Sequence, residues 1–284
     1  MKKKILLPTD FSKNAWNAIA YAIELYKNEA CDFYILHAFQ VSDYAMDSMM
    51  VPEPGNGIYE EKKRTSEKEF VKIMKRLSFR DTYPNHKFYT ILQHNNVLEA
   101  IKDVVEKKDI EMIIMGTQGT TSAKDIIYGS NTVLVMEKER NCPVMAIPED
   151  ITYKEPKEIV FPTDYKINVK HRELKYLIEL ASISNASIRI LHIAENDDGL
   201  SSEQEENKKL LEEYFEGLDF TFHTLHNIDV KSGLSSFVES RGSDIITFIN
   251  KKHSFFGSIF SRPMVKDLGH HARVPVLALH DLTN

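Results

Sequence analysis

A glycine-rich segment at residues 115–133 carries the clearest sign of chemistry in this sequence of 284 residues. It follows an apolar run at 110–115, which predicts a buried parallel strand, and leads into an amphipathic run that predicts a helix to about residue 140. Three glycines divide the segment, and small polar residues follow the last one. The glycines are Gly116, Gly119 and Gly129, and the polar residues are Ser130, Asn131 and Thr132.

Such a segment suits a phosphate group. The first N–H groups of a helix have no partner within the helix, and the helix dipole favours negative charge there. Glycines allow positive φ angles and a close approach of the backbone to a ligand. The hydroxyl groups of Ser130 and Thr132 add donors. The spacing, G-x2-G-x9-G-S-x-T, differs from that of a P-loop and from G-x-G-x-x-G, and no lysine directly precedes the Ser or Thr.

Three motifs, in the right order, resemble those of the universal stress protein family in its ATP-binding branch. The glycine-rich segment has the spacing of that family's nucleotide-binding loop. The other two motifs are Pro8-Thr9-Asp10-Phe11-Ser12, after the first predicted strand, and residues 142–148, at the last strand of the first half.

The resemblance implies an ATP site, with Mg²⁺ as an optional companion held by the phosphates and water. It assigns Pro8, Thr9 and Asp10 to the adenosine end and gives Ala38 a backbone contact with adenine. It places Met115 and Gly116 beside the ribose and α-phosphate, and Gly119, Gly129, Ser130 and Asn131 at the remaining phosphates. Asp10 has a second interpretation as a helix cap or turn residue.

The elements that position these residues alternate as β-α-β-α-β-α-β-α-β, which predicts an α/β fold with a parallel sheet and helices on both faces. A strand order of 3-2-1-4-5 would open a crevice between the first and fourth strands, at the carboxyl ends where ligands bind. Asp10 ends the first of these strands and Gly116 begins the loop after the fourth. The two motifs are therefore expected to meet there.

The pattern then repeats. Residues 159–165 match 5–11, residues 189–193 match 34–38, and residues 274–279 match 142–147. This predicts two tandem Rossmann-like domains, of the kind called adenine nucleotide alpha hydrolase-like, each with a five-stranded parallel sheet. They span residues 1–149 and 155–284, joined by a polar linker at 150–156. His37 and His192 recur at matching positions, which favours a role in the fold over ligand binding.

The glycine-rich segment is not repeated in the second half. By alignment of the two copies, Asn250 and His253 take the places of Gly116 and Gly119, and Ser261 takes that of Gly129. A residue other than glycine in a left-handed conformation costs about 1–2 kcal/mol. Pro263 also removes an N–H at the helix start. We therefore predict one nucleotide site, in the first half, and the basic loop of the second half either attracts an anion or is simply solvated.

Composition narrows the class of protein. A net charge of −6 and a pI near 6.0 argue against a nucleic-acid partner. The first apolar run ends at Pro8, and no later run is long enough to cross a membrane, which predicts a cytoplasmic protein. Neither H-E-x-x-H nor C-x-x-C occurs, so we predict no structural or catalytic metal. The two cysteines are expected to be buried.

Three functions remain open. We favour a nucleotide-binding regulatory protein with little or no turnover, because the histidine motif of related adenylyl-transfer enzymes is absent after the first strand. Slow ATP hydrolysis is the enzymatic alternative. A scaffold with a vestigial nucleotide site is the third.

The resemblance also suggests an assembly. Single-domain members of the family commonly dimerise through their last strands, which here are 144–148 and 276–280. In a duplicated chain these two strands are able to pair within the molecule as a pseudo-dimer. A further homodimer of whole chains stays open.

Overall fold

The computed structural model describes residues 2–41, 57–80, 83–117, 129–194, 199–250 and 274–280. Strands and helices alternate through both halves of the chain, as the sequence predicts. The elements of the first half are β1 (Lys3–Pro8), α1 (Lys13–Leu25), β2 (Cys31–Phe39), α2 (Gly57–Ser78), β3 (His86–His94), α3 (Val97–Lys108), β4 (Met112–Gly116), α4 (Ser130–Lys138) and β5 (Val144–Ile147). Those of the second half are β6 (Glu158–Pro162), α5 (His171–Ser184), β7 (Ser187–Ala194), α6 (Ser202–Tyr214), β8 (Phe220–His226), α7 (Val230–Arg241), β9 (Ile245–Asn250) and β10 (Val276–His280).

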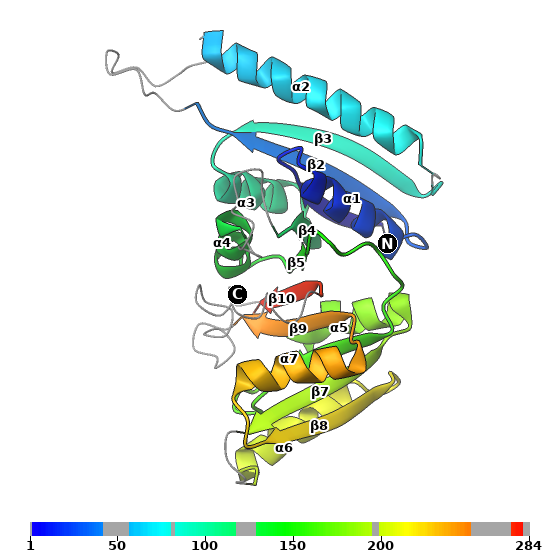
Figure 1. Ribbon diagram of the computed structural model, residues 1–284, viewed down its shortest axis with the longest axis vertical. Coiled ribbons are helices and arrows are strands. Elements are labelled where there is room, and N and C mark those ends of the chain that lie inside the picture. The colour runs from blue at the N-terminus through cyan, green and yellow to red at the C-terminus, as the bar shows by residue number, and fades with distance from the viewer. Residues whose placement is uncertain are drawn as a thin grey trace, which may run out of the picture.

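The strands of both halves belong to one ten-stranded sheet, in the order β3-β2-β1-β4-β5-β10-β9-β6-β7-β8 (Figure 1). Each half has the predicted order 3-2-1-4-5. The two expected five-stranded sheets are joined because β5 and β10 pair antiparallel, with Ala146 opposite Val276 and Val144 opposite Ala278. The pairing expected between the last strands therefore lies within the molecule, where each strand covers the other's edge.

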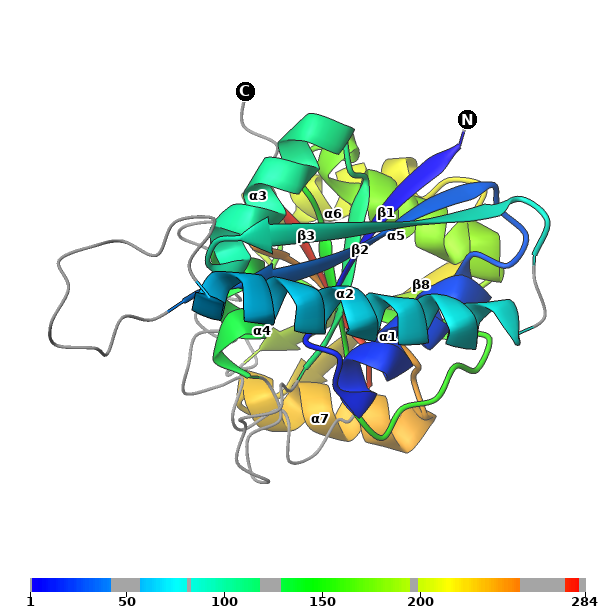
Figure 2. The same ribbon diagram turned by 90° about the horizontal axis from the view of Figure 1, so that it is seen from above.

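Helices cover both faces of the sheet. One core contains side chains of α1, α2, α5 and α6, and the other contains side chains of α3, α4 and α7, so each core runs through both halves. Neighbouring strand residues enter opposite cores: Ile5 and Leu7 pack in the first, and Leu6 in the second. This explains the nearly continuous apolar runs of the inner strands. At one end of the sheet α2 lies beside β3 in both views (Figures 1 and 2).

A repeated turn follows the first strand of each half. Phe11 and Tyr165 both have positive φ, at 65° and 56°, and the N–H of each donates to the hydroxyl of the threonine two residues earlier. In the first half Ser12 then caps α1, accepting a bond from the Ala15 N–H at 3.1 Å. The cap of α1 is therefore Ser12, and Asp10, given above as a possible helix cap, is not the N-cap residue.

Glu158 is the acidic centre of a network at the start of β6. Its carboxylate accepts hydrogen bonds from Arg189 at 2.9 Å, from Arg241 at 2.6 and 2.8 Å, and from Ser243 at 2.7 Å. Burial raises the pKa of Glu158, but the bonds from Arg241, Ser243 and Arg189 outweigh burial and lower the pKa to about 2. The network ties β6 and β7 to the end of α7.

We expect Glu158→Gln to destabilise the protein in a pH-dependent way. Because the folded-state pKa lies below the ordinary value of 4.5, the carboxylate's contribution is fully present above about pH 4.5 and is lost as the pH falls towards 2. The variant should lose on the order of 2–3 kcal/mol of unfolding free energy at neutral pH and less at about pH 3. Urea unfolding of both proteins at several pH values measures this, and a loss that does not vary with pH would contradict it.

Candidate nucleotide-binding site

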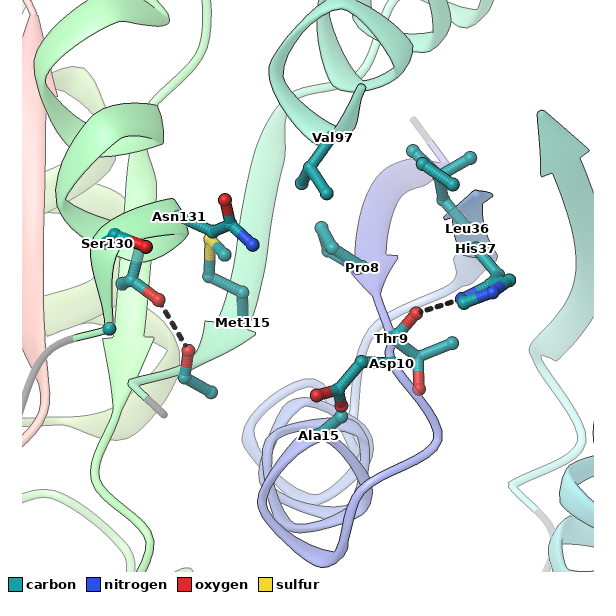
Figure 3. Close-up of a pocket in the computed structure, with 14 residues that line it drawn as sticks. Pro8, Thr9, Asp10, Ala15, Leu36, His37, Val97, Met115, Ser130 and Asn131 are labelled. Atoms are coloured by element: carbon teal, nitrogen blue, oxygen red, sulfur yellow. Dashed lines mark hydrogen bonds between the residues drawn. The ribbon is translucent and has the colours of Figure 1, made fainter. Parts of the chain in front are cut away.

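A cavity lies at the carboxyl ends of β1 and β4, where the chain order of the sheet reverses. Its volume is about 730 Å³, counting the open space at its mouth. The described residues that line it are Pro8, Thr9, Asp10, Ala15, Leu36, His37, Ala38, Val97, Met115, Gly116, Gly129, Ser130, Asn131 and Thr132 (Figure 3).

Ten of the eleven residues predicted from the sequence line this cavity. They come from four separate segments, which are the turn after β1 and the ends or starts of β2, β4 and α4. The eleventh, Gly119, lies outside the described residues. Four lining residues were not predicted: Ala15, Leu36, His37 and Val97. Their places in the sequence could have predicted them. Ala15 and Val97 lie in the first turns of α1 and α3, and Leu36 and His37 directly precede Ala38 near the end of β2.

The turn after β1 forms one wall. Thr9 is buried, and its N–H donates to the Leu36 carbonyl at 2.8 Å, which holds this turn against β2. Asp10 accepts a bond from the Ser12 N–H at 3.0 Å and also lines the cavity. Asp10 is therefore a turn residue, as one interpretation of the sequence had it. Contact between its carboxylate and a ligand stays a prediction.

The start of α4 forms the opposite wall, and Asn131 points from it towards the Pro8 side (Figure 3). Gly129, the N-cap residue, has no side chain with which to cap the first turn. Thr132 is buried, and its hydroxyl donates to the Gly116 carbonyl at 2.8 Å, which ties the helix start to the end of β4. Ser130 and Asn131 are exposed. This wall offers uncapped N–H groups and two exposed polar side chains, a combination suited to an anion.

Of the two reasons given above for glycine at positions 116 and 129, a positive φ angle was wrong, and close approach of the backbone to a ligand stays a prediction. Gly129 has φ −61°, and Gly116 is likewise outside the left-handed region. What Gly116 provides is close packing, because a Cβ there would lie 2.8 Å from the side-chain Cγ of Asn14 on α1. Glycine at 116 thus lets α1 approach the end of β4.

His37 is half-buried beside the cavity, and its Nδ1 donates to the Thr9 carbonyl at 2.8 Å. Burial lowers the pKa of His37, although the bond to Thr9 partly opposes this. His192 makes the same bond to the Thr163 carbonyl at 3.0 Å. Because the bond recurs in both halves, the geometry agrees with a role for these histidines in the fold.

The second half lacks glycine at the position that matches Gly116, as the sequence predicts, but the matching residue is not the one that the alignment of the two copies gave. Met112 pairs with Ile5, and Ile245 pairs with the matching residue Ile159. Counting along β4 and β9 from these pairs places Ile249 at the position of Gly116, so the assignment of Asn250 to that position was wrong by one residue. The other residues compared in that loop, His253, Ser261 and Pro263, lie outside the described residues.

Large side chains occupy the matching crevice of the second half. Ile193 stands in the place of Ala38, Phe248 in that of Met115, and both are buried, at 6% and 2% exposed. Ile193 packs against α7 at Gly233, where an added Cβ would lie only 3.1 Å from the Ile193 Cγ2. Counted from the caps Asn96 and Asp229, the matching residue on α3 is Ala100. The first half thus combines Ala38 with Ala100, and the second half combines isoleucine with glycine.

A model of the universal stress protein family matches residues 1–148, more than half of the chain. The chain belongs to the universal stress protein family. Universal stress protein MJ0531 of Methanocaldococcus jannaschii is 28% identical over 145 residues, which are 51% of this chain and 81% of that protein. Universal stress protein MJ0577 of the same organism is 28% identical over an alignment of 163 residues that covers 52% of this chain and 95% of that protein.

The structural likeness extends over both halves. The crystal structure of a universal stress protein from Archaeoglobus fulgidus has a TM-score of 0.72 to this universal stress protein, covering 98% of this chain and 96% of that one. At 17% identity, this likeness shows the fold alone. Every helix in the described ranges is too short or too polar to span a lipid bilayer.

A double-mutant cycle tests whether side-chain size separates the two crevices. Ala38→Ile alone should destabilise the protein by about 1–3 kcal/mol, because the new side chain meets the methyl group of Ala100. Ala100→Gly alone should cost about 1 kcal/mol, the usual cost of glycine within a helix. The double variant reproduces the Ile193–Gly233 pair. It should therefore be more stable, by about 0.5–2 kcal/mol, than the sum of the two single losses predicts. Additive losses in urea unfolding would show that the two crevices do not pack alike.

Proposed function

We propose that this universal stress protein binds one molecule of ATP per chain, in the cavity of the first half, and acts as a nucleotide-dependent regulator of the stress response. The observation that carries the proposal is the convergence of ten predicted residues on one cavity at the reversal point of the sheet. In this arrangement residues 1–149 form the nucleotide-binding domain. Residues 155–284 form a second domain whose matching crevice is filled by Ile193 and Phe248.

The phosphates would lie at the start of α4, against the uncapped N–H groups and Ser130, and the adenosine between Ala38 and the turn at Thr9 and Asp10. Among the described lining residues Asp10 is the only aspartate, glutamate, lysine or arginine, and the charge that its carboxylate carries is negative. A divalent cation with the phosphates would offset their repulsion from Asp10. This supports binding as the magnesium complex.

A regulatory role fits the lining better than rapid catalysis. Within the described part of the cavity, neither lysine nor arginine is present to stabilise charge on a transferring phosphoryl group. His37 uses its Nδ1 to hold the Thr9 carbonyl. Asp10 is the group that favours the enzymatic alternative, since a carboxylate that lines the same cavity as the phosphates could orient a water molecule. Slow ATP hydrolysis is therefore the second candidate.

Calorimetric titration with ATP and Mg²⁺ tests the site, with Asp10→Ala beside Asp164→Ala. These aspartates make the same turn, each accepting a backbone N–H two residues later at 3.0 Å. The two substitutions should therefore disturb local structure equally. We expect one equivalent of ATP per chain for the wild-type protein and unchanged binding for Asp164→Ala. Asp10→Ala should bind at least tenfold more weakly, because Mg²⁺ already offsets the repulsion from the phosphates and the variant loses the proposed contact with the adenosine.

An absence of binding to the wild-type protein would overturn the proposed function and leave the scaffold interpretation. Equal weakening in both variants would mean that the loss comes from a general effect on the fold, and that Asp10 has no specific role at the nucleotide site. Release of inorganic phosphate by the wild-type protein, measured at saturating ATP, separates the regulator from the slow ATPase. We expect no release above that of Asp10→Ala.

Gly129→Asp should change stability and binding in opposite directions. The φ and ψ of Gly129, −61° and 155°, are those of an extended N-cap residue, which aspartate readily adopts. Its carboxylate would cap α4 and favour the helix dipole, raising the unfolding free energy by about 0.5–1 kcal/mol. The same negative charge would repel the phosphates and abolish ATP binding. Thermal unfolding and titration of the one variant measure both effects, and retained ATP binding would contradict the placement of the phosphates.

A further inference from the structure

Helix α4 extends from the cavity to the boundary between the two halves (Figure 1). At its start, Thr132 binds the end of β4 and Ser130 lines the cavity. At its other end it is bonded to the second half, because the side-chain Nδ2 of Asn250 donates to the Met136 carbonyl at 2.7 Å. The helix is nine residues long, which is about 14 Å, and a helix of this length moves as a rigid unit.

Asn250 makes this contact from the last position of β9. It is 9% exposed, and the bond joins atoms buried between the two halves. The Met136 carbonyl is one of the last four of α4, which have no donor within the helix. Asn250 thus satisfies one of these carbonyls from outside, as a C-terminal cap does. Arg140, just beyond α4, donates in turn to the backbone carbonyl of Asn250.

The neighbouring polar side chain, His280, contributes no hydrogen bond to the contact between α4 and β9 within the described part of the chain. His280 on β10 lies opposite Asn250 in the sheet and is 4% exposed, yet neither ring nitrogen has a hydrogen-bond partner within the described part of the chain. Burial and the nearby Arg140 lower its pKa to about 3, so the imidazole is neutral. Asn250 and Arg140 are therefore the side chains whose bonds attach the end of α4 to β9.

We propose that Asn250 of the second half is a positioning residue for the nucleotide site of the first half. By fixing the end of α4, it fixes the N–H groups at the start of α4 in the place that the phosphates require. The second half thereby preorganises a site that it does not line. This inference rests on the proposed function and names how its site is regulated: a change at the junction of β9 and α4 alters nucleotide affinity. Linkage requires the reverse effect, so that nucleotide stabilises this junction.

The test compares Asn250→Ala with Asn207→Ala. Asn207 is 7% exposed and donates from its Nδ2 to the Tyr165 carbonyl at 2.8 Å, so it matches Asn250 in burial and bonding, but its partner lies within the second half. We expect Asn250→Ala to weaken ATP binding in calorimetry by at least fivefold, and Asn207→Ala to leave it within twofold of wild type. Arg140→Gln, a change at a less buried residue, should weaken binding in the same direction if Asn250→Ala does not fold.

Hydrogen exchange provides the second measurement. Saturating ATP should slow amide exchange in β9 and β10 of the wild-type protein, and should have no such effect in Asn250→Ala. If the wild-type protein binds ATP but neither Asn250→Ala nor Arg140→Gln changes the affinity more than Asn207→Ala does, the positioning role is wrong while the site stands. If the wild-type protein does not bind ATP, the proposed function itself is wrong.

Discussion

The antiparallel pairing of β5 with β10 is the contact on which the rest of the architecture depends. It joins two parallel sheets of order 3-2-1-4-5 into one sheet of ten strands and covers the edge that each half would otherwise expose. It also makes the two hydrophobic cores continuous across both halves. Because the pairing fixes where β9 and β10 end, it also brings Asn250 to the end of α4.

Within this shared frame, side-chain volume distinguishes the halves more than backbone conformation does. The Thr-Asp-aromatic turn and the bond from histidine to threonine are the same in both. Met115 and Phe248 end matching strands, and so do Ala38 and Ile193, and in each pair the larger residue is in the second half. The described residues of the second half that match the walls of the first-half cavity are therefore larger, while the order of the strands around them is the same.

Much of the fold and of the cavity lining was predictable, because local sequence patterns and the topology of parallel sheets determine them. Apolar runs mark the inner strands, the repeat gives two copies of one fold, and parallel strands place the motifs after β1 and β4 at one crevice. The register of β9 was not predictable, because apolar residues fill it on both faces and nothing in its sequence distinguishes Ile249 from Asn250 at the position of Gly116. The packing of Asn14 on Gly116 and the network around Glu158 also escaped prediction, since their members are far apart in the sequence.

Under the proposed function the two halves have different roles, and each role requires different residues. A half that binds a ligand needs a small residue at position 38 and an uncapped helix start at 129. A half that only supports the ligand-binding half needs neither of these features. It needs the residues that make contacts at the boundary between the two halves. Ile193 and Phe248 are compatible with that second task, because they belong to the core that contains α7 and leave the end of β9 free to contact α4. Even without a ligand of its own, the second half therefore contributes to the surroundings of the first-half cavity, through the bond from Asn250 to the Met136 carbonyl at the end of α4.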